Sequence, residues 1–244
     1  MKSGLYDRIG RSYVATRAED PRIAVAIHAE LGDARTVLNV GAGAGSYEPR
    51  DREVTAVEPS AVMRAQRPPG AAPCIDARAE ALPFGDGSFD ATMAVLSDHH
   101  WEDRLGGLRE LRRVGRRAVV FQWSPAYSDS FWLTRDYLPS FPGTHRVSLA
   151  ETEAALGATR ATPVPIPQDC RDGFLMAYWR RPEAYLDPEV RANISVFSLL
   201  PAAEVDAMVA SLRADLGSGA WARRNAALLE LDELDLGYRV LVAE

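Results

Sequence analysis

Lysine, cysteine and long apolar runs are scarce in this chain of 244 residues. Lys2 is its only lysine, and its two cysteines form no CxxC pair and no disulfide framework. Two isolated cysteines fit a reducing compartment, so we expect a cytoplasmic protein. The sequence has no run of about 18 apolar residues, which argues against a membrane span, and its polar N-terminus lacks the apolar core of a signal peptide.

A basic surplus is absent as well, because the net charge is −6. Proteins that bind nucleic acid through its phosphates usually carry such a surplus, so we expect no nucleic-acid partner. The one dense basic cluster comprises Arg112, Arg113, Arg116 and Arg117. We interpret it as the solvated end of a helix that enters a strand, with an anion site as the alternative.

Short apolar segments alternate with helical patterns through the first half of the chain. Asp20 and Pro21 predict the start of a helix, since they suit the N-cap and the first helical position. Further segments predict strands over 36–40, 53–57, 72–75, 89–96 and 118–123, with a helix over 101–113 between the last two. This alternation predicts an α/β fold, a Rossmann-like, doubly wound, mostly parallel sheet.

The second half is less regular. Helical patterns cover 130–138, 149–156 and 202–216, and Pro163 limits 161–166 to an edge strand. We predict an N-terminal helical lid segment over 1–34, a cofactor-binding core over 35–167, a helical cap insertion over 168–233 and an antiparallel final strand within 234–244. Aromatic residues of this half could line an apolar pocket or fill the core: Phe131, Trp132, Tyr137, Phe141, Phe174, Tyr178, Trp179, Tyr185 and Phe197.

A glycine-rich segment follows the first predicted strand directly. Gly41, Gly43 and Gly45 have the spacing GxGxG, which lets the backbone turn sharply and approach a ligand without a Cβ in the way. The dinucleotide fingerprint GxGxxG requires a further glycine where Ser46 stands. A tight turn without a ligand is the alternative.

Glu58 ends the second predicted strand, 17 residues after Gly41. An acid in this place can accept hydrogen bonds from both ribose hydroxyls of a nucleotide. The alternative is an acid at a strand end that faces water. Both a nicotinamide cofactor and S-adenosylmethionine carry an adenosine, so these residues do not separate the two.

Four segments carry a resemblance to a known family. The order VLNVGAGAGSYEP, TAVEPS, ARAEALPFGDGSFDATMAVLSDHHW and LRELRRV resembles the class I S-adenosylmethionine-dependent methyltransferases of the type 11 kind. The resemblance spans roughly residues 5–123, about half of the chain. It implies S-adenosylmethionine as the cofactor and S-adenosylhomocysteine as the product.

The resemblance also implies roles for individual residues. The glycine loop with Ala42 would pass under the methionine and ribose, Glu58 would hold the ribose, and Arg17, with Tyr13 in a lid segment, could meet the methionine carboxylate. The remaining implied contacts are Pro59, Ser60 and Met63 beside the adenine, Ala79 and Glu80 at the adenine edge, and Val95 and Leu96 along the methionine.

Two positions depart from the family pattern. Asn39 replaces the usual acid after the first strand; its amide can still organise the glycine loop, so it stays among the predicted cofactor-site residues. Arg78 replaces the acid that commonly precedes the Ala-Glu pair, which removes a side-chain contact to the adenine amino group.

Asp98, His99 and His100 follow the fourth predicted strand, where the acceptor would meet the methyl group. A histidine there could serve as a general base, because its pKa lies near neutrality, or it could simply cap the next helix. We expect no metal site, since no cysteine or carboxylate cluster completes a ligand set.

We therefore predict in-line methyl transfer to a small molecule, a reaction that needs alignment more than catalytic groups. The alternatives are a regulatory or non-methylating protein that keeps the cofactor site, and a nicotinamide-dependent oxidoreductase. Lys2 alone cannot supply the lysine of a Tyr-x-x-x-Lys pair, which disfavours the latter. The acceptor and the oligomeric state stay open.

Overall fold

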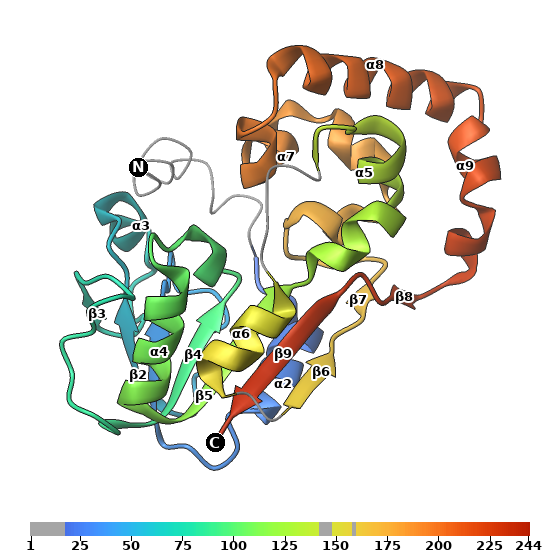
Figure 1. Cartoon of the computed structure of the whole chain (residues 1–244). Coiled ribbons are helices and arrows are strands. Elements are labelled where there is room, and N and C mark those ends of the chain that lie inside the picture. Colours follow the sequence, from blue (N-terminus) through green and yellow to red (C-terminus); the bar gives the residue numbers. More distant parts are fainter. Residues whose placement is uncertain (1–17, 142–147, 158–159) are drawn as a thin grey trace.

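A seven-stranded sheet forms the centre of the molecule in the computed structural model, which describes residues 18–141, 148–157 and 160–244 (Figure 1). The strand order across it is β3-β2-β1-β4-β5-β9-β6. The strands are β1 (Thr36–Val40), β2 (Glu53–Val57), β3 (Cys74–Ile75), β4 (Phe89–Val95), β5 (Gly115–Trp123), β6 (Arg160–Pro163) and β9 (Tyr238–Ala243).

The direction of the strands divides the sheet into two parts. The neighbours from β3 to β5 all pair in parallel, as βαβ connections require. β9 lies between β5 and β6 and is antiparallel to both, with Phe121 opposite Val240. The predicted fold class, a mostly parallel α/β sheet with an antiparallel final strand, is confirmed.

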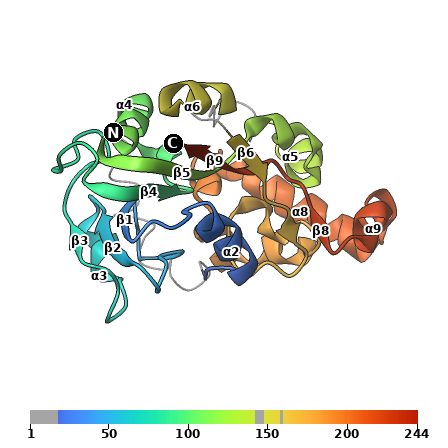
Figure 2. The same ribbon diagram turned by 90° about the horizontal axis from the view of Figure 1, so that it is seen from below.

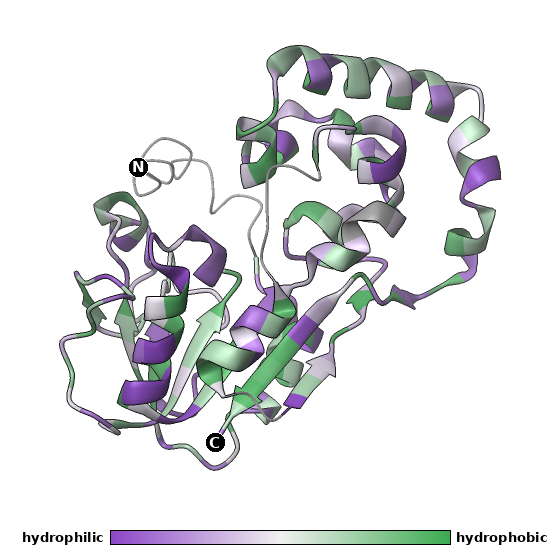
Figure 3. Cartoon of the chain, viewed as in Figure 1, coloured by the Kyte–Doolittle hydropathy of each residue, from purple (hydrophilic) through white to green (hydrophobic). Residues whose placement is uncertain are grey.

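Alternate residues of each strand serve two separate cores. Leu38 and Val120 point to the face covered by α4 (Arg104–Val114) and α6 (Leu149–Leu156), whereas Val37 and Phe121 point to the face covered by α2 (Pro21–Ala29). Figure 2 shows the sheet between these helices. β9 is hydrophobic along most of its length (Figure 3), as expected for a strand covered on both faces.

The first helix ties the sheet to a distant part of the chain. Asp20 caps α2 and accepts a hydrogen bond from the amide of Arg22, as its sequence position predicts. Its other oxygen accepts from the amide of Arg171, 3.1 Å away. The cap of this helix therefore also holds the start of the irregular second half.

A helical layer covers one end of the sheet. It contains α5 (Trp132–Tyr137), α7 (Pro188–Ala192), α8 (Ala202–Gly217) and α9 (Ala220–Arg224), together with 3₁₀ helices over Leu175–Tyr178, Pro182–Leu186 and Ser195–Ser198. At its centre Trp132 packs edge-to-face against Tyr185 and Trp221. α5 precedes the predicted 168–233 insertion, so the layer draws on more of the chain than that segment. A short ladder of β7 (Ile166–Pro167) and β8 (Glu233–Leu234) brings the two ends of the segment together.

Most predicted elements occur, and several differ in their bounds. α4 begins at Arg104 rather than near Trp101, because Asp103 caps it and Asp98–His100 forms a separate 3₁₀ turn. β3 has only two residues. In the described part of the chain, no helix is both long and apolar enough to cross a membrane.

The arginine cluster at the end of α4 serves the fold. Arg113 forms ion pairs with Glu110 and Asp86, and Arg117 pairs with Glu244. These contacts fit the interpretation of a solvated helix end that leads into β5.

Candidate active site

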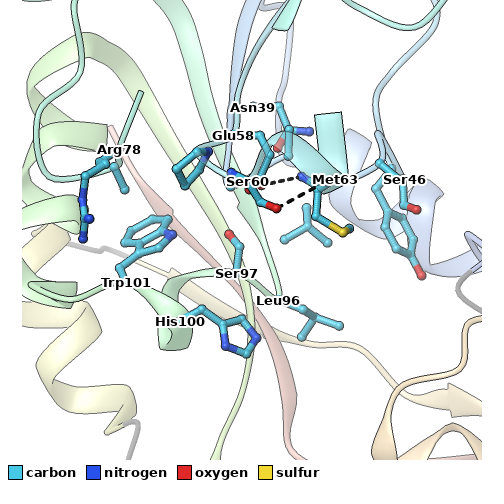
Figure 4. Close-up of a pocket in the computed structure, with 18 of the residues that line it drawn as sticks. Asn39, Ser46, Glu58, Ser60, Met63, Arg78, Leu96, Ser97, His100 and Trp101 are labelled. Atoms are coloured by element: carbon cyan, nitrogen blue, oxygen red, sulfur yellow. Dashed lines mark hydrogen bonds between the residues drawn. The ribbon is translucent and has the colours of Figure 1, made fainter. Parts of the chain in front are cut away.

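A cavity of about 160 Å³ lies at the carboxyl ends of β1, β2 and β4 (Figure 4). In doubly wound sheets this edge is where ligands bind. The cavity brings together most residues that the sequence singled out: Asn39, Gly41, Ala42, Gly43, Glu58, Pro59, Ser60, Met63, Ala79, Glu80, Val95, Leu96 and His100. Gly45 belongs to the same loop but does not line the cavity. Tyr13 and Arg17 lie outside the described residues.

The glycine loop has a backbone that only glycine adopts without strain. Gly41, Gly43 and Gly45 have φ values of +70°, +53° and +97°. A Cβ on Gly41 would lie 2.7 Å from the Cβ of Ser97, which is too close for any real contact. The loop is therefore constrained both by its positive φ values and by the side chain of Ser97, two residues after β4.

Glu58 is joined to this loop by its carboxylate. One oxygen accepts a hydrogen bond from the amide of Gly43 at 2.9 Å, and the other accepts from the amide of Ser60 at 2.8 Å. The side chain is largely buried, with 8% exposed. Burial raises the pKa of Glu58 above its ordinary value of 4.5, although the two amides oppose this shift. Each oxygen keeps a second lone pair for a ligand that enters the cavity.

A buried ion pair supports the loop from beneath. Arg67 and Glu48 lie 2.8 Å apart, and their side chains are 6% and 9% exposed. Arg67 donates to the carbonyl of Gly43 at 3.4 Å, and Asn39 donates to Glu48 at 3.2 Å. Asn39 thus reaches the loop through Glu48 and Arg67 instead of bonding to it directly.

The far end of the cavity is shaped by residues near the AEALPF segment. Glu80 accepts hydrogen bonds from the amides of Glu102 and Asp103, at 2.8 and 3.2 Å. The side chain of Arg78 pairs with Glu102 at 2.6 Å. Glu80 therefore anchors the segment after β4 at Glu102 and Asp103. Glu102 is part of the cavity wall at this end.

Several lining residues were missed by sequence reasoning, namely Ala44, Ser46, Tyr47, Arg78, Ser97, Trp101 and Glu102. Trp101 faces the cavity across from Glu58 (Figure 4). The sequence signal that could have identified these lining residues is their closeness in the chain to the glycine loop and to the end of β4. Ser97 also fixes the end of β1, because its hydroxyl donates to the carbonyl of Val40 at 3.0 Å.

A second cavity of about 100 Å³ adjoins the first, and Leu96 and His100 line both. Leu96 has a φ of +49°, a strained conformation for a leucine that is typical of functional positions. The other walls come from β4, β5, β9 and the helical layer: Asp98, His99, Gln122, Trp123, Phe141, Phe174, Leu175, Met176, Ile194, Ser195, Val196 and Tyr238.

Asp98 lies at the polar end of this second cavity. It is 1% exposed and pairs with the guanidinium of Arg104 at 2.8 Å, while Nδ1 of His99 lies 3.9 Å from its other oxygen. Burial alone would raise the pKa of Asp98, but His99 and Arg104 outweigh it and hold the pKa below its ordinary value. Within the described ranges, no cluster of three or more His, Cys, Asp or Glu side chains could hold a metal ion.

Comparisons with known proteins identify the family. The family described as "Methyltransferase domain" matches residues 38–121. A solved protein from Anabaena variabilis ATCC 29413, described as a methyltransferase from an antibiotic biosynthesis pathway, is 33% identical, with a TM-score of 0.86 over 94% of this chain and 99% of its own. The chain therefore belongs to the S-adenosylmethionine-dependent methyltransferases, and its cofactor is S-adenosylmethionine.

More distant proteins share parts of this likeness. Geranyl diphosphate C-methyltransferase from Streptomyces coelicolor A3(2), solved with S-adenosylhomocysteine, is 17% identical, with a TM-score of 0.51 over 92% of this chain and 78% of its own. That likeness concerns the fold alone. The uncharacterised protein YafE of Escherichia coli (strain K12) is 42% identical over 53 residues, which span 26% of its length and 20% of this chain.

Proposed function

We propose that this enzyme transfers the methyl group of S-adenosylmethionine to a small molecule bound in the second cavity. The observation that carries the proposal is that the two cavities share Leu96 and His100. A methyl donor in the first cavity and an acceptor in the second would meet at these residues. The likeness to a methyltransferase of an antibiotic biosynthesis pathway, at 33% identity, supports a small-molecule acceptor.

The first cavity fits the cofactor in two respects. Its floor includes Gly41 and Gly43, which carry no side chain, so a ligand can approach the main chain closely. Its side wall presents the Glu58 carboxylate, already held by two amides in a place suited to the ribose hydroxyls. In this proposal Ser60 and Met63 lie beside the adenine, the amide of Ala79 meets its edge, and Val95 and Leu96 line the methionine.

The chemistry divides between the cofactor and the chain. S-adenosylmethionine, when bound, supplies an activated methyl group on a sulfonium. The protein aligns the acceptor with that group and excludes water, and orientation of this kind is worth about 7–11 kcal/mol. His100, which lines both cavities, is placed to receive the proton of an acceptor hydroxyl or amine. Asp98 and His99 line the second cavity only, and we assign them to the acceptor side.

Binding and transfer can be tested separately. Isothermal titration with S-adenosylhomocysteine should give saturable binding, and nicotinamide dinucleotides should give none. Methyl-labelled S-adenosylmethionine, incubated with the enzyme and a cell extract, should label the low-mass fraction. Label in protein or nucleic acid would contradict the small-molecule assignment.

The role of His100 has its own test once an acceptor is found. Replacing it (His100→Gln) should lower kcat about hundredfold, the size of a lost general base, with S-adenosylhomocysteine binding unchanged. The matched control is His99→Gln, which lies one residue away and lines only the second cavity. An equal loss in both variants would assign the effect to packing instead of proton transfer.

A further inference from the structure

Three residues that line the second cavity each have a buried polar atom with no hydrogen-bond partner among the described residues. These atoms are Oδ1 of Asp98, Nε2 of Gln122 and Nε1 of Trp123. Asp98 and Gln122 are each 1% exposed, so water does not compensate them freely. A buried polar group without a partner costs about 1–3 kcal/mol, and three around one cavity indicate that a ligand completes them.

The orientation of Gln122 is fixed by its surroundings. Its Oε1 accepts a hydrogen bond from the hydroxyl of Thr152 at 2.8 Å and another from Arg104 at 3.3 Å. A guanidinium can only donate, so the side of the amide that faces Arg104 must be the oxygen. Nε2 is therefore left as a donor without a partner.

The charge of Asp98 is already balanced. Arg104 lies 2.8 Å from one carboxylate oxygen. Nδ1 of His99 lies 3.9 Å from the other oxygen, beyond hydrogen-bond distance, so that oxygen is left as an acceptor. No arginine or lysine is among the described residues that line the cavity, and most of its walls are apolar or aromatic. Trp123 itself packs edge-to-face against Phe141.

These groups together select one ligand chemistry. An anion would find two donors but also the Asp98 carboxylate, and neither an arginine nor a lysine among the described lining residues. An ammonium would satisfy Asp98 but could not accept from Gln122 or Trp123, because it only donates. A hydroxyl both donates and accepts, and it carries no charge to desolvate.

We propose that the second cavity takes an uncharged, mainly apolar molecule whose hydroxyl is held by Asp98, Gln122 and Trp123. The proposal rests on the proposed function only in calling this cavity the acceptor site. It names the acceptor class as an apolar alcohol or phenol, in contrast to the diphosphate named for the Streptomyces coelicolor enzyme.

Four probes of one shape test this on the full chain saturated with S-adenosylhomocysteine. Naphthalene, 2-naphthol, 2-naphthoate and 2-naphthylmethylamine are titrated at neutral pH by ligand-observed NMR. We expect 2-naphthol to bind about tenfold more tightly than each of the other three. Equal affinities, a preference for a charged probe, or no saturable binding of any probe would overturn the proposal. The S-adenosylhomocysteine titration is separate, so failure of the cofactor site would be recognised independently.

A variant then links the preference to Gln122. Gln122→Glu keeps an oxygen for Thr152 and Arg104 but replaces the Nε2 donor with an acceptor. It should abolish the preference for 2-naphthol over naphthalene and favour the amine, with S-adenosylhomocysteine binding unchanged. Gln168→Glu, at a glutamine outside both cavities, is the control and should leave all affinities as they are.

A second variant covers the case in which Gln122→Glu does not fold. Trp123→Phe removes the indole N–H and keeps an aromatic wall, and it should reduce the same preference while naphthalene still binds. If the folded variants retain the full preference for 2-naphthol, these residues do not hold the hydroxyl and the proposal is wrong.

Discussion

The two cavities share a wall at Leu96 and His100, yet the rest of each is lined by different parts of the chain. The first is formed by the glycine loop and by the other short loops that follow β1, β2, β3 and β4. The second is formed by side chains that come from β5, β9 and several parts of the helical layer. The difference indicates that the cofactor site depends on local turns, whereas the acceptor site depends on how the whole second half packs.

Each cavity also contains one buried carboxylate, and the two are shifted in opposite directions. Burial raises the pKa of Glu58, while His99 and Arg104 keep that of Asp98 low despite its burial. Glu58 faces backbone amides and Asp98 faces charged side chains. A contrast between backbone and side-chain partners thus appears in the electrostatics.

The largest effect should come from a methyl group added to the backbone of the first cavity. Gly41→Ala combines a left-handed φ with a Cβ 2.7 Å from Ser97, and it should lower the free energy of unfolding by about 3 kcal/mol and strongly weaken cofactor binding. Gly70→Ala is the matched control, because Gly70 has a φ of +83° but open space around its Cβ position. It should cost only about 1 kcal/mol in chemical denaturation. Equal costs would show that the contact with Ser97 does not constrain the loop.

A smaller effect is expected from removing the carboxylate of the first cavity. Glu58→Ala should weaken S-adenosylhomocysteine binding by about 1–3 kcal/mol, the size of a lost charge-assisted hydrogen bond, in isothermal titration. Val196→Ala, on the wall of the second cavity, should leave this affinity unchanged. If instead Val196→Ala weakens S-adenosylhomocysteine binding and Glu58→Ala does not, the assignment of the cofactor to the first cavity is wrong.

The smallest effect is a difference in pH dependence between the two carboxylates. The pKa of Glu58 is raised above 4.5, so its contribution to stability is complete below pH 4.5 and declines as the pH rises through the folded-state value. The pKa of Asp98 is lowered below 3.8, so its contribution is complete above pH 3.8 and declines as the pH falls further. Urea unfolding of the wild type, Glu58→Ala and Asp98→Ala over a pH series should therefore give differences from wild type with opposite slopes. If the two stability differences changed with pH in the same direction, the pKa values of Glu58 and Asp98 would not be shifted in opposite directions.

The sequence predicts the first half of the molecule far better than the second, for a physical reason. The strands Thr36–Val40 and Glu53–Val57 are recognisable because they are short and rich in apolar and β-branched residues. The glycines after Val40 mark a turn with positive φ values. Glu58 and Ser60 could be placed because they directly follow a strand. Local chemistry determines all of these features.

The second cavity has no such local signature. Gln122 and Trp123 look like ordinary strand residues, and their unpartnered atoms become evident only when Thr152 and Arg104 occupy the other side. The sequence of Phe141 and Phe174 fits a pocket wall as well as a core, and only the packing of the helical layer brings them to one cavity. Contacts between residues far apart in sequence decide these positions, so a single sequence does not reveal them.

The position of β9 has a consequence for how the protein is made. This strand joins β5 to β6, yet it follows every residue of the helical layer in the chain. During synthesis, β5 and β6 therefore leave the ribosome before β9, the strand that joins them. Until then, the exposed borders of β5 and β6 are open to strand pairing with other molecules, so the interval before β9 emerges is when the nascent polypeptide most needs protection by chaperones.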